Sequence, residues 1–259
     1  SITVVSTSGK PEARRAVEAA RTVASAVCLA RDWVNEPANV LYPETFAESA
    51  RGVVKGSRID VEVLDDKALE RGGYGGLVAV GGGSAHGPRL VRYSYAPRGA
   101  KAHLALVGKG ITFDTGGLNL KPSDGMYTMK DDMAGAAAVL AATRAIAELG
   151  LKVRVTTYAA MAENMPSGTA YRPSDVLTMY GGTTVENVNS DAEGRLVMAD
   201  ALVRAGQDSP DLIIDVATLT GACVVALGER VAGLMASSDE AADKVLYAAE
   251  SAGEAFWQL

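Results

Sequence analysis

The chain is poor in cysteine, histidine and aromatic residues, and these shortages exclude several classes of protein. Two cysteines, Cys28 and Cys223, lie far apart in 259 residues and form no C-x-x-C pair. This count excludes a disulfide-stapled secreted scaffold and predicts a reducing compartment. Both cysteines lie among alanines and valines, so we expect both to be small buried residues of the core. With only His86 and His103, and no Gly-x-Ser-x-Gly segment, the sequence argues against a serine triad.

Long apolar runs and clustered charge are also missing. The chain has no 18-residue apolar stretch and no signal-peptide pattern at its N-terminus, so we expect a cytoplasmic protein without a membrane span. The formal net charge is −6 and no run of five like charges occurs, which argues against nucleic acid as a partner. Aromatics make up 5% of residues, so the core must rely on small and β-branched side chains, as in helices packed on a mostly parallel sheet.

Apolar spacing alternates between helix and strand periods along the chain. Helices are predicted over residues 11–33, 43–51, 65–71, 133–149, 194–205 and 240–253. Strands are predicted over residues 59–63, 77–80, 90–95, 104–107, 153–160 and 212–216. The alternation predicts an α/β fold, a three-layer sandwich with a mixed, mostly parallel central sheet flanked by helices.

The most informative stretch is the heptapeptide 189–195, Asn-Ser-Asp-Ala-Glu-Gly-Arg. In an extended backbone, alternate side chains project from one face, so Asp191, Glu193 and Arg195 would converge. Carboxylates held that close need a neutralising partner, and a divalent cation with oxygen ligands supplies one. The heptapeptide alone leaves an alternative equally open, a polar turn that starts a helix with its acids near the N-terminus.

A second group of polar residues follows the predicted strand at 104–107. Lys109 and Asp114 lie in a glycine-rich segment, residues 108–117, and Lys121 follows. We expect this segment to be a loop at the carboxyl ends of strands, where open α/β sheets bind ligands. It lacks both common phosphate-binding patterns, so phosphate is not favoured. Asp131 and Asp132 cap the next helix, or one of them faces the cleft. With two histidines in all, any metal site here must be rich in oxygen.

Taken in order, these segments resemble the leucyl aminopeptidase family of dinuclear metallopeptidases, the M17 type. The matching segments are 107–117, Lys121, 129–135, 162–166, 189–195 and 217–222, and the similarity runs from about Asn35 onward. Ser190 stands where the family usually has threonine, and Asp131 is an additional acid. The resemblance implies that residues 1–34 are a linker helix leading from an absent N-terminal domain. It also implies that residues 35–259 are the metallopeptidase catalytic domain with its C-terminal part missing, so we expect a fragment.

The resemblance further implies a role for each matching residue. The implied ligands of two divalent ions are Lys109, Asp114, Asp132, Asp191 and Glu193, with Asp114 and Glu193 bridging. Lys121 would polarise the scissile carbonyl, and Arg195 would hold a bicarbonate ion as general base. The implied substrate contacts are Met129, Thr218, Leu219 and Gly221.

The implied activity is that of a metalloexopeptidase. A metal-bridged water would hydrolyse the N-terminal peptide bond of peptides that begin with leucine or another residue, using two Zn²⁺, Mn²⁺ or Mg²⁺ ions. Family resemblance also implies a homohexamer. Two alternatives stay open: a narrow Cys-Gly dipeptidase, and a DNA-binding regulator of the same family, which the acidic balance disfavours.

Overall fold

The computed structural model describes residues 5, 7 and 9–259. The chain divides into two compact units, Ser1–Thr218 and Leu219–Leu259. Among the described residues, every helix is too short or too polar to cross a membrane.

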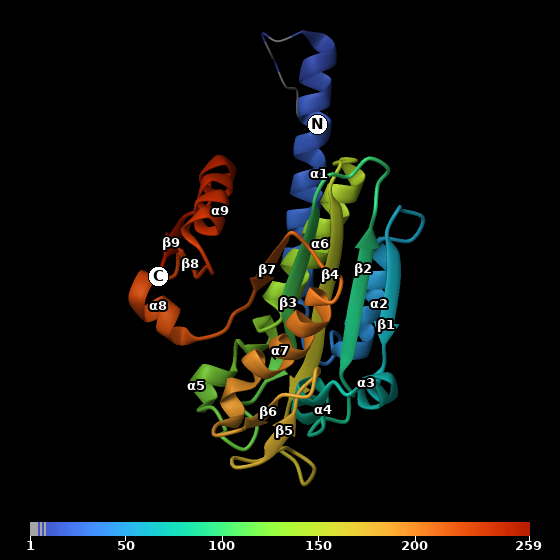
Figure 1. The fold of residues 1–259 in the computed structure, drawn as a ribbon. Coiled ribbons are helices and arrows are strands. Elements are labelled where there is room, and N and C mark those ends of the chain that lie inside the picture. The colour runs from blue at the N-terminus through green and yellow to red at the C-terminus, as the bar shows by residue number, and fades with distance from the viewer. Residues whose placement is uncertain (1–4, 6, 8) are drawn as a thin grey trace. The chain divides into compact units, whose positions relative to one another are not determined.

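The larger unit is built around a five-stranded sheet (Figure 1). The strands lie in the order β1-β2-β4-β3-β7. Their bounds are β1 Asp60–Leu64, β2 Arg89–Tyr95, β3 His103–Asp114, β4 Arg154–Asn164 and β7 Leu212–Val216. The neighbours β4, β3 and β7 are parallel, whereas β2 is antiparallel to both β1 and β4. Four strands therefore run one way and β2 runs the other, which confirms the mixed, mostly parallel sheet.

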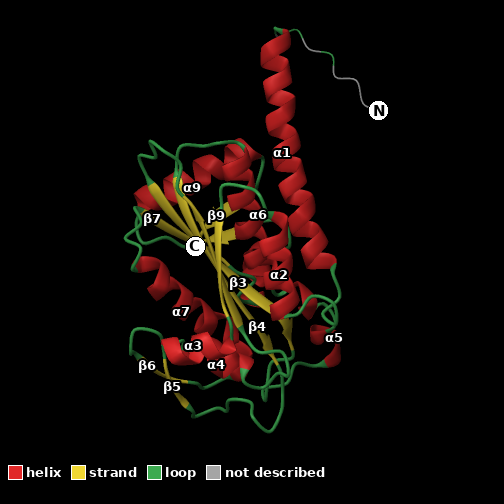
Figure 2. Ribbon diagram, turned by 90° about the vertical axis from the view of Figure 1, so that its right-hand side faces the viewer, coloured by secondary structure: helices red, strands yellow, loops and turns green. Residues whose placement is uncertain are grey.

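Helices cover both faces of this sheet and complete the three predicted layers (Figure 2). On one face, α6 (Ala134–Glu148) and α2 (Pro43–Val53) pack on the strands, and α1 (Lys10–Asn35) packs on α6. On the other face lie α7 (Glu193–Gly206), α4 (Gly75–Gly81) and α3 (Asp66–Gly72). Each face has its own apolar core, one including Phe46 and Leu140, the other Leu77 and Val197.

Short elements complete the two units. In the larger unit they are α5 Ser123–Met126, the 3₁₀ turns η1 Met129–Asp131 and η2 Ser190–Ala192, and the antiparallel pair β5 Val176–Thr178 and β6 Thr184–Glu186. The smaller unit consists of α8 Gly221–Leu227, β8 Ala232–Leu234, α9 Asp239–Ala252 and β9 Phe256–Gln258. Its two strands are parallel.

The prediction of a strand over residues 77–80 is wrong, because these residues lie in helix α4. Leu77 and Val80 are both buried, and the Leu77 N–H donates to Asp200 Oδ2 of α7 at 2.9 Å. A distant carboxylate thus supplies an acceptor for the start of α4. A short apolar run cannot distinguish a strand from a buried helix without that partner.

The prediction of a loop over residues 108–117 is also wrong in large part, because β3 continues to Asp114. Lys109 therefore lies within the sheet, in register with Ala160 of β4. A Cβ at Gly108 would come within 2.6 Å of the Ala136 Cα of α6. The glycine is needed because the helix packs so closely against the strand.

Cys28 is not the core residue that its neighbours suggested. Its side chain is exposed, and Cys223 is half-buried. Helix α1 packs on the core through Ala26, Leu29 and Trp33. Cys28 lies on the opposite side of the helix from Ala26, since two residues advance about 200° around the axis.

Candidate metal centre

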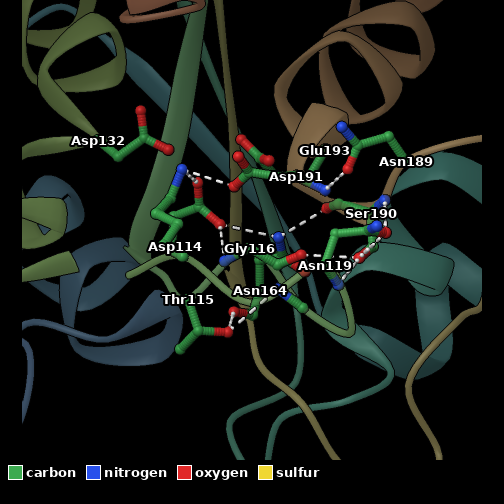
Figure 3. Close-up of polar contacts among 12 residues, drawn as sticks. Asp114, Thr115, Gly116, Asn119, Asp132, Asn164, Asn189, Ser190, Asp191 and Glu193 are labelled. Atoms are coloured by element: carbon green, nitrogen blue, oxygen red, sulfur yellow. Dashed lines mark hydrogen bonds and ion pairs between the residues drawn. The ribbon is translucent and has the colours of Figure 1, made fainter. Parts of the chain in front are cut away.

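Three predicted carboxylates meet where β3 ends and α7 begins (Figure 3). Asp114 is the last residue of β3, Asp191 lies in turn η2, and Glu193 is the first residue of α7. One carboxylate oxygen from each lies within 4.8 Å of the others. Asp114 and Glu193 are only 2% exposed, so water screens their charges little.

The backbone that brings Asp191 and Glu193 together is not extended, so of the two alternatives for the heptapeptide the extended segment is wrong and the turn that starts a helix is confirmed. A 3₁₀ turn runs directly into α7, and Asn189 Oδ1 caps the turn by accepting from the Asp191 N–H at 2.8 Å. The segment therefore starts a helix and also supplies two of the gathered carboxylates. Arg195 is exposed and, within the described residues, forms no ion pair.

Lys109 joins Asp132 to this group. Its Nζ lies 2.8 Å from Asp132 Oδ2 and 2.8 Å from Glu193 Oε1, and it donates to the Thr218 carbonyl at 3.0 Å. The Thr218 hydroxyl donates to Asp132 Oδ1 at 2.8 Å. Burial alone would lower the pKa of Lys109, but the charges of Asp132 and Glu193 outweigh it and raise the pKa. Burial raises the pKa of Asp132. Of the adjacent acids 131 and 132, Asp132 therefore faces the centre.

Lys121 enters the centre from the loop after β3. Its Nζ lies 3.0 Å from Asp114 Oδ2 and 2.6 Å from Asp191 Oδ1. Burial opposes its charge, but the hydrogen bonds to these two carboxylates outweigh burial and raise the pKa of Lys121. In the ionised state, four carboxylates face two ammonium groups, which leaves a net charge of −2.

The donor set fits divalent cations. Excess negative charge is held out of water, and Glu193 Oε2 is buried without a hydrogen-bond partner among the described residues. An unpaired buried carboxylate oxygen is costly, and a cation would satisfy it. Neither histidine contributes. His103 is buried against Thr156, and His86 lies in a loop beside Glu163.

Four predicted site residues remain, which are Met129, Thr218, Leu219 and Gly221. Met129 lies half-buried in η1, two residues before Asp131. Thr218 contacts Lys109 and Asp132, as described above. Leu219 and Gly221 belong to the smaller unit, where Leu219 is 47% exposed and Gly221 begins α8.

Sequence reasoning missed a set of neutral polar residues behind the carboxylates. Asn164 Nδ2 donates to Asp114 Oδ1 at 2.8 Å and to the Ser190 carbonyl at 2.9 Å. Tyr171 and Asn119 also contact Ser190. Asn164 lies in a segment that matched the family pattern, but nothing in the sequence marked Asn119 or Tyr171.

Comparison with known proteins gives a match over most of the chain. Residues 28–259 match the model of the cytosol aminopeptidase family, catalytic domain. A "Probable cytosol aminopeptidase" of Cutibacterium acnes is 62% identical, with 100% of this chain and 51% of that protein aligned. A "Probable cytosol aminopeptidase" of Streptomyces avermitilis is 56% identical, with 99% and 50% aligned. The chain thus spans about half the length of the curated relatives it matches.

Solved structures agree in fold and in sequence. The bottromycin maturation enzyme BotP in complex with Mn aligns with a TM-score of 0.91 and 48% identity, over 97% of this chain and 55% of that one. Leucyl aminopeptidase from Trypanosoma brucei in complex with actinonin also gives a TM-score of 0.91, with 39% identity over 93% and 48% of the two chains. Since the family model covers most of its length, this chain belongs to the cytosol aminopeptidase family.

Proposed function

We propose that the chain carries the catalytic centre of a dinuclear-metal-dependent aminopeptidase. Such a metalloexopeptidase releases the N-terminal residue, leucine or another, from peptides. The observation that carries the proposal is a group of four carboxylates around two lysines, along the second half of β3 and at the start of α7, in which three of the acids, Asp114, Asp132 and Glu193, are buried. The names of the aligned proteins, cytosol aminopeptidase and leucyl aminopeptidase, point to the same activity.

The proposed metal ligands are Lys109, Asp114, Asp132, Asp191 and Glu193, with Asp114 and Glu193 shared between two ions. Their net negative charge and the unpartnered Glu193 Oε2 support this assignment. Zn²⁺, Mn²⁺ and Mg²⁺ all accept such oxygen-rich sites, and an aligned structure holds Mn. Bound there, the two ions would activate a water molecule and polarise the scissile carbonyl.

Lys109 can act as a ligand only as a neutral amine. Asp132 and Glu193 raise its pKa, which opposes that role. A dication among the same carboxylates would reverse the balance, because it repels the ammonium form. The Lys109 side chain packs closely against Gly194, where an added Cβ would come within 2.8 Å of Lys109 Nζ. This close packing supports a fixed position for the amine.

Lys121 and Arg195 are the proposed catalytic side chains. Lys121 Nζ reaches the carboxylates while its side chain stays 17% exposed, so it can also meet a substrate. It would donate a hydrogen bond to the carbonyl oxygen as negative charge develops there. Arg195 lies two residues beyond Glu193 and is exposed, so its guanidinium is free to hold a planar bicarbonate ion as general base.

The substrate and the assembly are also proposals. Met129, Thr218, Leu219 and Gly221 would contact the peptide, and Thr218 already lies beside Asp132. Residues 1–34, of which 1–4, 6 and 8 lie outside the described part of the chain, would act as a linker that includes most of α1, and residues 35–259 would act as the catalytic domain. Because its relatives are named cytosol aminopeptidases, we place the protein in the cytoplasm. We propose a homohexamer on the family resemblance alone.

The direct test is hydrolysis of a chromogenic leucine amide by the full-length protein, with and without Mn²⁺ or Zn²⁺. We expect activity that depends on the metal. Lys121→Ala should lower kcat by roughly 10²–10³-fold, the usual effect of removing a donor to an oxyanion. Lys101→Ala, at an exposed position before β3, should leave activity unchanged. Metal-independent hydrolysis, or full activity of the Lys121 variant, would refute the proposal.

A further inference from the structure

Two segments that carry proposed ligands are joined by a reciprocal pair of residues, Asn119 and Ser190 (Figure 3). One segment is the loop 115–121, which follows Asp114 and ends at Lys121. The other is the turn 189–193, which carries Asp191 and Glu193. Neither Asn119 nor Ser190 contacts the metal ions in the function proposed above.

The pair is held by hydrogen bonds in both directions. The Asn119 N–H donates to Ser190 Oγ at 2.8 Å, and the Ser190 N–H donates to Asn119 Oδ1 at 2.9 Å. The Ser190 hydroxyl hydrogen is shared between the Gly116 carbonyl at 2.7 Å and Asn119 Oδ1 at 2.9 Å. Ser190 is completely buried, so water does not compete for these bonds.

The carbonyl of Ser190 ties the pair to the carboxylates. It accepts from Asn164 Nδ2 at 2.9 Å and from the Tyr171 hydroxyl at 2.7 Å. The same Asn164 amide donates to Asp114 Oδ1 at 2.8 Å. Every polar group of Ser190 therefore forms a hydrogen bond, and its carbonyl is connected to Asp114 through the Asn164 amide.

The loop can fold this tightly because of Gly116. Its φ is +87°, and a Cβ there would come within 2.4 Å of the Asn119 carbonyl oxygen and 2.9 Å of Asp191 Oδ1. The Lys121 N–H closes the loop by donating to the Thr115 carbonyl at 2.9 Å. The loop therefore lies directly against the turn that carries Asp191.

We infer that Asn119 and Ser190 are positioning residues that hold Asp191 and Lys121 in place beside Asp114. This inference rests on the proposed function. Asp114, Asp191 and Glu193 gather negative oxygens within 4.8 Å, and their repulsion pushes the loop and the turn apart. Neutral hydrogen bonds oppose that separation without adding charge, so the pair keeps the ligand oxygens in place for a cation.

The test is calorimetric titration of Mn²⁺ into the metal-stripped full-length protein, combined with thermal unfolding of the same samples. Ser190→Ala and Asn119→Ala should each weaken Mn²⁺ binding by about 10-fold, the lower end of the effects seen when an outer support of the metal ligands is lost. The Ser190→Thr variant keeps the hydroxyl, and its affinity for Mn²⁺ should lie within a few-fold of the wild-type affinity. Because the Asn119 side chain belongs to an exposed residue, its variant keeps the test usable if Ser190→Ala does not fold.

Thr143→Val is the matched control. Thr143 is a buried hydroxyl that bonds to Val139 and Thr157, away from the carboxylates. The Thr143→Val variant should have a lower unfolding temperature than the wild type and should bind Mn²⁺ with unchanged affinity. If the Asn119 and Ser190 variants behave like this control, the pair is only structural and the inference fails while the proposed function stands. If the wild type itself binds no Mn²⁺, both fail.

Discussion

At the scale of single residues, the centre concentrates charge that the chain balances only in part. Lys109 lies between Asp132 and Glu193, and Lys121 lies between Asp114 and Asp191. Burial opposes each ammonium group, yet the carboxylates raise the pKa of both lysines. The acids therefore dominate the electrostatics of the centre, as a site for added cations requires.

Glu193→Gln tests the ligand that the two ions would share. The amide keeps the volume of the side chain and an oxygen for Lys109, but it loses the charge. We expect at least about 10-fold weaker Mn²⁺ binding, with folding retained because Lys109 still pairs with Asp132. Glu163→Gln is the matched control, because Glu163 is a buried acid bonded to Ser84 and His86. Wild-type affinity in the Glu193 variant would count against its role as a ligand.

At the scale of elements, α7 organises the face of the sheet on which it lies. Its first residue, Glu193, faces the centre, and its buried Asp200 accepts from the N–H groups of Leu77 and Tyr180 at 2.9 and 2.8 Å. Helix α4 and the segment after β5 are therefore both held by one carboxylate of α7. The hydrogen bond from the Leu77 N–H to Asp200 explains why residues 77–80 form a helix in the structure.

Asp200→Ala should destabilise the larger unit strongly. The buried Leu77 N–H would lose its acceptor at a cost of about 1–3 kcal/mol, and the half-buried Tyr180 N–H at a cost of about 1 kcal/mol, the lower end of that range. Urea unfolding should therefore show a loss of about 2–4 kcal/mol in the free energy of unfolding. Asp60→Asn, at an exposed position on β1, should change it by less than about 0.5 kcal/mol. A loss below about 0.5 kcal/mol in the Asp200 variant would rule out the anchoring role.

A second element contact, at the end of α7, should make stability depend on acid pH. Asp208 accepts from Tyr158 at 2.6 Å, from Arg92 at 3.0 Å and from Arg204 at 3.2 Å. Burial opposes its charge, but these hydrogen bonds outweigh it and lower the pKa of Asp208 to about 2. Because the folded pKa lies below the unfolded value, the stabilisation is present above pH 4 and is lost between about pH 4 and 2.

The measurement is the free energy of unfolding of wild type and Asp208→Asn at several pH values between 7 and 2. At pH 7 the variant should be less stable by on the order of 1 kcal/mol, because solvent screens part of the interaction. Below pH 4 the difference between the two proteins should shrink. A difference that stays constant down to pH 2 would show that the charge of Asp208 contributes nothing.

At the scale of the whole molecule, the centre depends on contacts that are distant in sequence. Asp114 of β3, Asp132 before α6 and Glu193 of α7 come together because β3 pairs with β4 and packs between α6 and α7. A bound cation would hold these elements together, since the unfolded chain offers no such site.

Removal of metal should therefore lower the stability of the whole protein. Treatment with a chelator should lower the unfolding temperature, and Mn²⁺ should restore it in a concentration-dependent way. At 100 times the dissociation constant the gain should be about 2.7 kcal/mol. The Glu193→Gln variant should show a smaller response to the same ion. An unfolding temperature unaffected by chelator and by Mn²⁺ would contradict a metal centre in the folded chain.

Much of the molecule follows from the sequence because local signals are strong there. The helices at residues 11–33, 43–51 and 133–149 and the strands at 90–95 and 212–216 are confirmed. Their apolar spacing is set by the faces that they bury. The acids and lysines of the centre were also identified from sequence, through motifs that match the family in order. The comparisons confirm that family.

Only the tertiary structure decided how those residues meet. The heptapeptide 189–195 leaves an extended segment and a helix start equally open, the predicted strand ends before Lys109, and the Asn119–Ser190 pair gives no signal in the sequence. These features depend on partners remote in sequence, because α6 packs closely against β3 and the loop after Asp114 bonds to Ser190 in the turn. Helix α4, where the sequence predicts a strand, depends in the same way on Asp200 of α7. The sequence by itself thus determined the fold class and the chemical groups. Long-range packing and hydrogen bonds decided their geometry, because a buried polar group is satisfied only by the partner that the fold brings to it.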